Sequence, residues 1–187
     1  MITGTPPQLD RTVVVSFLLF WGHRPSADGR PTSSCLSQWW PAPFTVDGRR
    51  FATAEHWMMW RKAELFGDAA AAAAVLAADG PREAKQRGRE VRGFDAAVWA
   101  EHRFDVVVAG TGHKFGAHRD LRDYLVGTGG AVLVEASPDD AVWGIGLAAD
   151  HPDARTPERW PGLNLLGEAL MVVRAALTAD GPPPGAG

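Results

Sequence analysis

The chain contains very little cysteine, since Cys35 is the single one among its 187 residues. One thiol cannot form an internal disulfide, and CxxC motifs and clustered Cys and His residues are also missing. A disulfide scaffold and a structural zinc site are therefore not expected. The sequence predicts a cytoplasmic protein with no metal and no cofactor.

Long hydrophobic runs are missing as well. The apolar run at residues 13–21 is far too short to span a bilayer, and it has no clear signal-peptide cleavage site. Its β-branched and aromatic residues favour a buried strand instead. We expect no association with a membrane.

The sequence also has no excess of positive charge and no standard nucleotide-binding loop. The net charge is −3 and the sequence pI is about 6.0, so bulk electrostatic attraction to nucleic acid is not expected. Neither GxGxxG nor GxxxxGK[ST] occurs. A phosphorylated ligand would have to be held by a few local side chains.

Length and composition are typical of one compact domain, because 45% of the residues are hydrophobic. The Pro- and Gly-rich ends, residues 1–10 and 179–187, are expected to be disordered around a single domain at 11–178. Helical patterns outnumber the strand patterns, which predicts a predominantly helical α+β fold with a few short strands. The expected helices cover 53–66, 69–78, 81–89, 96–115, 118–126 and 163–177, and the strands 13–21, 131–136 and a hairpin at 44–51.

Two charged residues, Glu55 and Lys62, lie in a helix that is otherwise rich in tryptophan and methionine. Residues seven apart share a helix face, so both side chains should line one surface. An ordinary exposed stripe would account for them, but the apolar residues around them indicate a helix packed on most sides. A carboxyl group held there would have a pKa open to tuning, as acid–base catalysis requires.

Two further pairs could bind a ligand. Lys85 and Arg89 share a helix face and could hold a phosphate, although a solvated face balanced by neighbouring glutamates is an equal alternative. Asp140 and Trp143 lie in a loop that follows a strand, where they could contact ribose hydroxyls and a base. The alternative there is a turn aspartate with a core tryptophan.

Taken together, several segments resemble the NADAR family, also called YbiA-like. They include Leu36-Ser37 before Trp-Pro-x-Pro-Phe-x-x-Asp-Gly, Thr-x-Glu-His-Trp with Lys62, and Pro81-x-x-Ala84-Lys85-x-x-Gly88-Arg89. The second half adds Lys114-Phe115, Glu135-x-Ser137-x-x-Asp140-x-x-Trp143-Gly144-x-Gly146 and Gly162-x-Asn164-x-Leu166-Gly167. The similarity runs from about residue 17 to residue 174, and the motifs are specific in combination.

The resemblance implies an N-glycosidase that cleaves the bond between a ribose anomeric carbon and a nitrogen. Activities in the family include removal of ADP-ribose from guanine bases and hydrolysis of ribosylamino-pyrimidine intermediates of riboflavin synthesis. The implied partner is thus a ribosyl or ADP-ribosyl substrate, with ADP-ribosylated nucleic acid as one option. The implied catalytic residues are Glu55, Lys62 and Asp140, and the implied ligand-binding residues are Lys85, Arg89, Phe94, Trp143, Gly144 and Asn164.

Two departures from the family pattern concern ligand preference. Gln38 stands where many relatives have asparagine, and Phe94 stands where tryptophan is common, which keeps a π-face but loses an indole donor. Two chemical routes remain open: a carboxylate-assisted attack by water, or a Schiff base on Lys62 or Lys85. A module that binds ADP-ribose or NAD without cleaving it is the alternative function.

Overall fold

The computed structural model describes residues 15–179. Of the ends expected to be disordered, 1–10 and 180–187 lie outside the described residues, whereas Ala179 is the last residue of a helix. The described part confirms the expected α+β fold dominated by helices. Its helices are α1 (Ala54–Leu65), α2 (Ala69–Leu76), α3 (Pro81–Arg89), α4 (Ala96–Ala117), α5 (Arg119–Gly127) and α6 (Leu165–Ala179). Its strands are β1 (Phe17–Phe20), β2 (Phe44–Val46), β3 (Arg49–Phe51) and β4 (Val132–Glu135), with two short 3-10 helices, η1 (Ser33–Leu36) and η2 (Pro157–Arg159).

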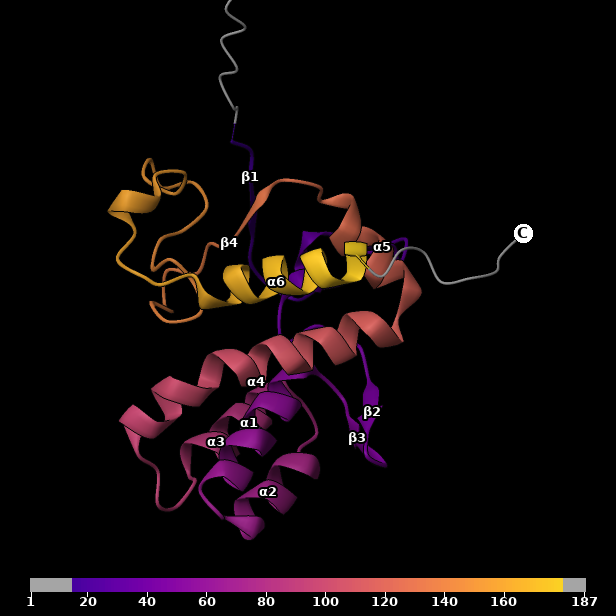
Figure 1. Ribbon diagram of the computed structural model, residues 1–187, viewed down its shortest axis with the longest axis vertical. Helices are drawn as coiled ribbons and strands as arrows, with labels where there is room; N and C mark the ends of the chain where they lie inside the picture. The colour runs from indigo at the N-terminus through magenta and orange to yellow at the C-terminus, as the bar shows by residue number, and fades with distance from the viewer. Residues whose placement is uncertain (1–14, 180–187) are drawn as a thin grey trace, which may run out of the picture.

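The long helix α4 crosses the middle of the molecule and packs against both halves. Figure 1 shows α1, α2 and α3 on one side of it, and α5, α6, β1 and β4 on the other. The ordered loop between β4 and α6 lies beside the second group. A core of large apolar side chains runs through both groups, which makes the described residues one domain.

The strands form two separate pairs. β1 and β4 are parallel, with Phe20 opposite Glu135, so the segments that follow the two strands leave the pair at the same end. β2 and β3 form the hairpin that the sequence predicts, and its turn has Asp47 and Gly48 at positive φ values of 48° and 75°. The parallel pair is the one that matters for the site, because its carboxyl end delivers two loops to one place.

Helix α1 is buried on nearly all sides, as its sequence indicates. Thr53 caps its first turn by accepting a hydrogen bond from the backbone N–H of His56, and the Thr53 hydroxyl also lies 2.8 Å from His56 Nδ1. The Trp57 indole N–H donates to the Val106 carbonyl of α4 at 2.8 Å. The helix is therefore fixed against the central helix as well as by apolar packing.

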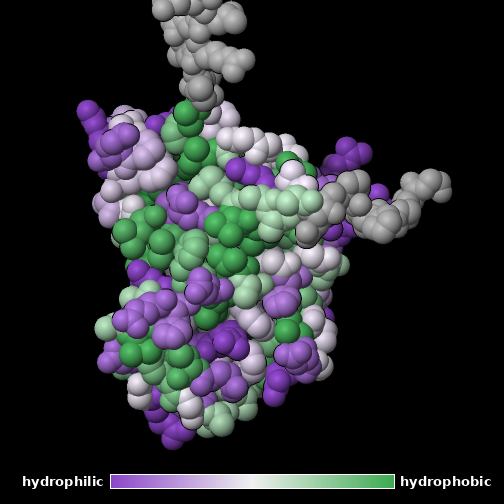
Figure 2. Space-filling view, in the orientation of Figure 1, coloured by the Kyte–Doolittle hydropathy of each residue, from purple (hydrophilic) through white to green (hydrophobic). Residues whose placement is uncertain are grey.

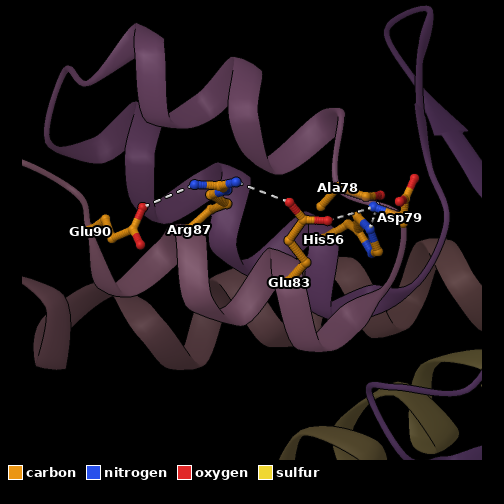
Figure 3. A network of polar contacts seen from close by, with 6 residues as sticks. All are labelled: His56, Ala78, Asp79, Glu83, Arg87 and Glu90. Carbon is orange, nitrogen blue, oxygen red and sulfur yellow. Dashed lines mark hydrogen bonds and ion pairs between the residues drawn. The ribbon is translucent and has the colours of Figure 1, made fainter.

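Helix α3 is held in place by a network of polar contacts, shown in Figure 3. Glu83 accepts a hydrogen bond from the backbone N–H of Asp79 at 3.1 Å, just before the helix begins. Arg87 bridges Glu83 and Glu90 at 3.1 and 3.4 Å, and His56 of α1 lies 3.2 Å from the Ala78 carbonyl. The segment just before α3 is thus joined by hydrogen bonds both to α1 and to the first turn of α3.

Helix α6 approaches the backbone of β4 closely at Gly167. A Cβ atom at this position would collide with the Leu133 carbonyl oxygen and with the side chain of Asn164. On the outside of the same helix Val172 is 48% exposed, and Figure 2 shows apolar side chains over this helix. The tight contact on the inside explains why glycine is required there.

We expect Gly167→Ala to lower the free energy of unfolding by about 3 kcal/mol, because a backbone carbonyl cannot move aside as a flexible side chain could. Urea denaturation measures the change. Gly112→Ala in α4 is the control, since a Cβ there meets nothing within 4 Å and should raise stability by up to about 1 kcal/mol. Equal stability of the two variants would contradict the close approach of α6 to β4.

Candidate active site

A cavity of about 820 Å³ lies where the segments after β1 and β4 meet the η1 region and the first turns of α3. This volume suits a ligand of nucleotide size. Cationic side chains and acidic side chains both line it, together with two tryptophans. The lining residues are Trp21, Gly22, His23, Arg24, Thr32, Ser34, Ser37, Trp39, Arg82, Lys85, Glu135, Ser137, Asp139 and Asp140.

Glu55 lies behind this lining, in the first turn of α1, and is only 2% exposed. Its backbone N–H donates to the Gln38 carbonyl, which ties the start of the helix to the segment that carries Trp39. Its Oε1 is buried with no hydrogen-bond partner among the described residues. A buried carboxyl oxygen without a partner is costly, so its retention needs a chemical reason.

Burial raises the pKa of Glu55 to about 7. The positive charge of Lys85, a hydrogen bond from Trp39 and, more weakly, the charge of Arg89 each lower this pKa in part. The negative charge of Asp140 raises it further. Near neutral pH this carboxyl group can therefore exist in both protonation states. That property is what a general acid or base requires.

Lys85 and Asp140, both predicted from the sequence, line the cavity. Asp140 Oδ1 accepts hydrogen bonds from the backbone N–H groups of Val142 and Trp143, at 2.9 and 2.8 Å, so the loop itself fixes this carboxylate. The structure thus brings Glu55, Lys85 and Asp140 together, with Arg89 within electrostatic range of Glu55. Arg89 lies outside the cavity lining.

Gly144 and Trp143 hold the loop that carries Asp140 against the rest of the protein. A Cβ on Gly144 would lie 2.8 and 2.9 Å from the carbonyl oxygens of Glu135 and Asp140, so only glycine allows the loop to close against the end of β4. Trp143 is partly buried and packs against the main core rather than lining the cavity. Direct ligand contact by these two residues stays a prediction.

Asn164 also has a partner in the scaffold. It has a positive φ of 54°, is 1% exposed, and its side chain donates to the Leu133 carbonyl and accepts from the Glu135 N–H. Both contacts lie on β4, and Asn164 is outside the cavity lining. Its side chain positions the end of β4, whereas ligand binding by it stays a prediction.

Lys62 and Phe94 meet at the other end of α3. The Lys62 ammonium donates to the Gly88 carbonyl at 2.8 Å and lies 4.0 Å from the centroid of the Phe94 ring. Burial, and secondarily Arg89, lowers the pKa of Lys62. Lys62 and Glu55 both have partners on α3, but Lys62 and Phe94 lie outside the cavity lining, so their predicted roles stay untested.

Sequence reasoning missed Trp39 and Glu135. The Trp39 ring lies tilted against the His23 ring, with 5.3 Å between their centroids. The cationic groups of Arg82 and Lys85 lie 6.0 and 5.9 Å from the centroid of the Trp39 ring. Trp39 is adjacent to the Trp40-Pro41 motif and could have been found there. Glu135 begins the motif that runs to Gly146, but a glutamate at the end of a strand is common, so its position alone did not indicate a role at the site.

A buried lysine fixes the wall that carries Trp39. Lys114 of α4 is 1% exposed, and its ammonium donates to the carbonyls of Cys35 and Ser37 at 2.6 and 2.8 Å. Burial lowers the pKa of Lys114 to about 7 and raises the pKa of the Cys35 thiol to about 11. This explains the Lys-Phe motif in structural terms.

Neither a metal cluster nor a membrane helix is found in the part of the chain that the structure describes. No group of three or more His, Cys, Asp or Glu side chains in residues 15–179 could hold a metal ion. No helix in the same range is both long and apolar enough to cross a membrane.

The chain is similar to proteins of a known family. The NADAR domain model matches residues 19–178. The chain is 41% identical over 144 residues to N-glycosidase R617 of Acanthamoeba polyphaga mimivirus, covering 74% of this chain and 85% of that protein. It is 35% identical over 112 residues to riboflavin biosynthesis protein PYRR of Zea mays, covering 58% of this chain and 16% of that one.

The fold is also similar to that of a solved structure. The NMR structure of the E. coli protein YbiA superimposes with a TM-score of 0.70 at 25% sequence identity, covering 88% of this chain and 86% of that one. The family match covers the cavity and both halves of the fold. The chain therefore belongs to the NADAR family.

Proposed function

We propose that this chain is a hydrolase that cleaves the N-glycosidic bond between a phosphorylated or ADP-linked ribose and a nitrogen. The general class, hydrolysis of N-glycosidic bonds, follows from family membership and from relatives named as N-glycosidases. The observation that supports this activity at the cavity is Glu55, a buried carboxyl group with a raised pKa beside a cavity of nucleotide size.

The charges of the cavity support a phosphorylated ribosyl substrate. Arg24, Arg82 and Lys85 contribute positive charge to the lining and suit phosphate oxygens. Asp140 is held by its own loop and could accept hydrogen bonds from ribose hydroxyls. Trp39 offers a ring face for a base.

Cleavage of such a bond passes through a transition state with positive charge on the anomeric carbon and ring oxygen, as in O-glycoside hydrolysis. Glu55 in its carboxylate form would stabilise this charge or activate the attacking water. Two substrate classes fit: an ADP-ribosylated guanine, free or in nucleic acid, and a phosphorylated ribosylamino-pyrimidine. The name of the Zea mays relative supports the second class.

The test is to incubate the purified protein with a DNA oligonucleotide carrying ADP-ribosylated guanine, and separately with a ribosylamino-pyrimidine phosphate. Chromatography should show free ADP-ribose and an oligonucleotide with unmodified guanine from the first substrate. It should show free pyrimidine and ribose phosphate from the second. Binding of both substrates without release of either would favour the non-catalytic ADP-ribose or NAD module.

Borohydride added during turnover separates the two routes. A reduced adduct on a lysine would support the Schiff base, whereas continued turnover without any adduct supports attack by water. Lys85 is the better placed amine, since it lines the cavity, whereas Lys62 donates to a backbone carbonyl outside it.

A further inference from the structure

Glu135 is a carboxyl group at this cavity that the proposed function has not used. It is the last residue of β4, and its backbone N–H donates to Asn164 Oδ1 at 3.0 Å. Its carbonyl accepts from the N–H groups of Ser137 and Ile145 at 2.9 and 3.0 Å. The backbone of Glu135 is therefore fixed on both sides, which gives its side chain a defined starting point.

The Glu135 side chain lines the cavity, whereas Glu55 lies behind the lining. Its Oε2 is buried without a hydrogen-bond partner among residues 15–179. A purely structural carboxylic acid would donate its proton to a nearby carbonyl or other acceptor. The buried oxygen thus has bonding capacity left for a ligand.

The charges that face Glu135 come from several elements. Burial raises the pKa of Glu135 to about 8, and the negative charges of Asp140 and Glu55 add to this, while Lys85 of α3 opposes it. The other charged or titratable groups in the same lining are His23, Arg24, Arg82 and Asp139. Burial therefore favours the protonated form of Glu135, which is the form that can donate a proton.

We propose that Glu135 is the proton donor to the leaving nitrogen of the N-glycosidic substrate, with Glu55 as its carboxylate counterpart. This inference rests on the proposed function. It assigns separate roles to the two buried carboxyl groups: one touches the leaving group in the cavity, and the other supplies negative charge from behind it.

As the bond between the anomeric carbon and nitrogen breaks, its electron pair goes to the nitrogen, which takes the Glu135 proton. Water forms the new bond to the anomeric carbon and releases one proton to solvent, while the Glu55 carboxylate stabilises the positive charge from behind the lining. Glu135 regains a proton from solvent, so one water is consumed and both carboxyl groups return to their first states.

The test compares two leaving groups in the Glu135→Gln variant. A ribosylamino-pyrimidine phosphate has a basic leaving nitrogen and needs a proton, so its kcat should fall by about 10²-fold to 10⁴-fold. The 5-phosphate of 4-nitrophenyl riboside has a leaving group that departs unprotonated, so its kcat should fall by less than about tenfold. Glu55→Gln should instead slow both substrates.

The pH profile gives a second readout. In the wild type, activity on the N-linked substrate should fall at alkaline pH as Glu135 loses its proton, and Glu135→Gln should lack this alkaline limb. Glu135→Asp keeps an acidic group and should retain the limb with reduced kcat. The melting temperature of each variant shows whether it folds as the wild type does.

The outcomes separate this inference from the function itself. No cleavage of any N-linked substrate by the wild type would overturn the proposed function. An active wild type with Glu135→Gln within about threefold of its rate, or with equal losses on both leaving groups, would overturn the role of Glu135 alone.

Discussion

Glu55→Gln is expected to lower kcat for N-glycosidic cleavage by about 10³-fold, while substrate affinity stays within a few-fold of the wild type. Glutamine keeps the shape of the side chain and removes both the negative charge and the capacity to take a proton. Because Glu55 is 2% exposed behind the cavity lining, it contributes little contact area to the bound ligand. Single-turnover kinetics and calorimetric binding measure the two quantities.

Stability provides an internal check on the same variant. The pKa of Glu55 is raised above its ordinary value of 4.5 to about 7, so between these pH values the folded state binds more protons than the unfolded state. Stability from this group is therefore lost as pH rises through that window. Glutamine does not titrate, so the variant should be at least as stable as the wild type at pH 8.

Glu64→Gln is the matched control. Glu64 is exposed on the same helix, so this variant removes the same charge from α1 without touching the site and should keep wild-type kcat. A Glu55→Gln enzyme with kcat within tenfold of the wild type would contradict a catalytic role for this carboxyl group. Loss of binding and turnover together would indicate a role in substrate binding instead.

Replacing Lys85 should have the second largest effect. Lys85→Met removes the cation that opposes the raised pKa values of both Glu55 and Glu135. Both pKa values should rise, so the whole pH profile should shift to higher pH. Loss of a cation from the lining should also weaken binding of the phosphorylated substrate, which lowers kcat/KM at pH 7 by about 10²-fold.

Lys85→Arg distinguishes charge from nucleophilicity. Arginine retains the positive charge and can bind phosphate, but it cannot form a Schiff base. If Lys85 acts through its charge, the arginine variant should keep the wild-type pH optimum and most of its activity. Complete loss of turnover in Lys85→Arg, with substrate still bound, would contradict the route by direct attack of water.

The sequence predicted most of the fold because its local signals agree with its tertiary contacts. The Asp47-Gly48 turn, the Thr53 cap and the apolar surroundings of α1 each specify their element locally. The η1 and η2 helices were not predicted, since short 3-10 turns have no strong local pattern. The last helix begins at Leu165 rather than 163, because Asn164 adopts a positive φ to bridge to β4.

The candidate site was predicted only in part, because burial and direction are tertiary properties. Helical spacing indicates that Glu55 and Lys62 share a face, and both do have partners on α3. Spacing cannot show that Lys62 meets the carbonyl of Gly88 outside the cavity lining. The position of Glu135 depends on the parallel pairing of β1 with β4, which joins segments more than a hundred residues apart.

The pH dependence of kcat/KM for the wild type tests the central claim most directly, because it reports the ionisation of both buried carboxyl groups in the free enzyme. With Glu55 acting as the carboxylate and Glu135 as the acid, the profile should be a bell with its maximum near neutral pH, because burial raises the pKa values of both groups. A profile that stays flat from pH 5 to 9 during active turnover would contradict catalysis by this pair.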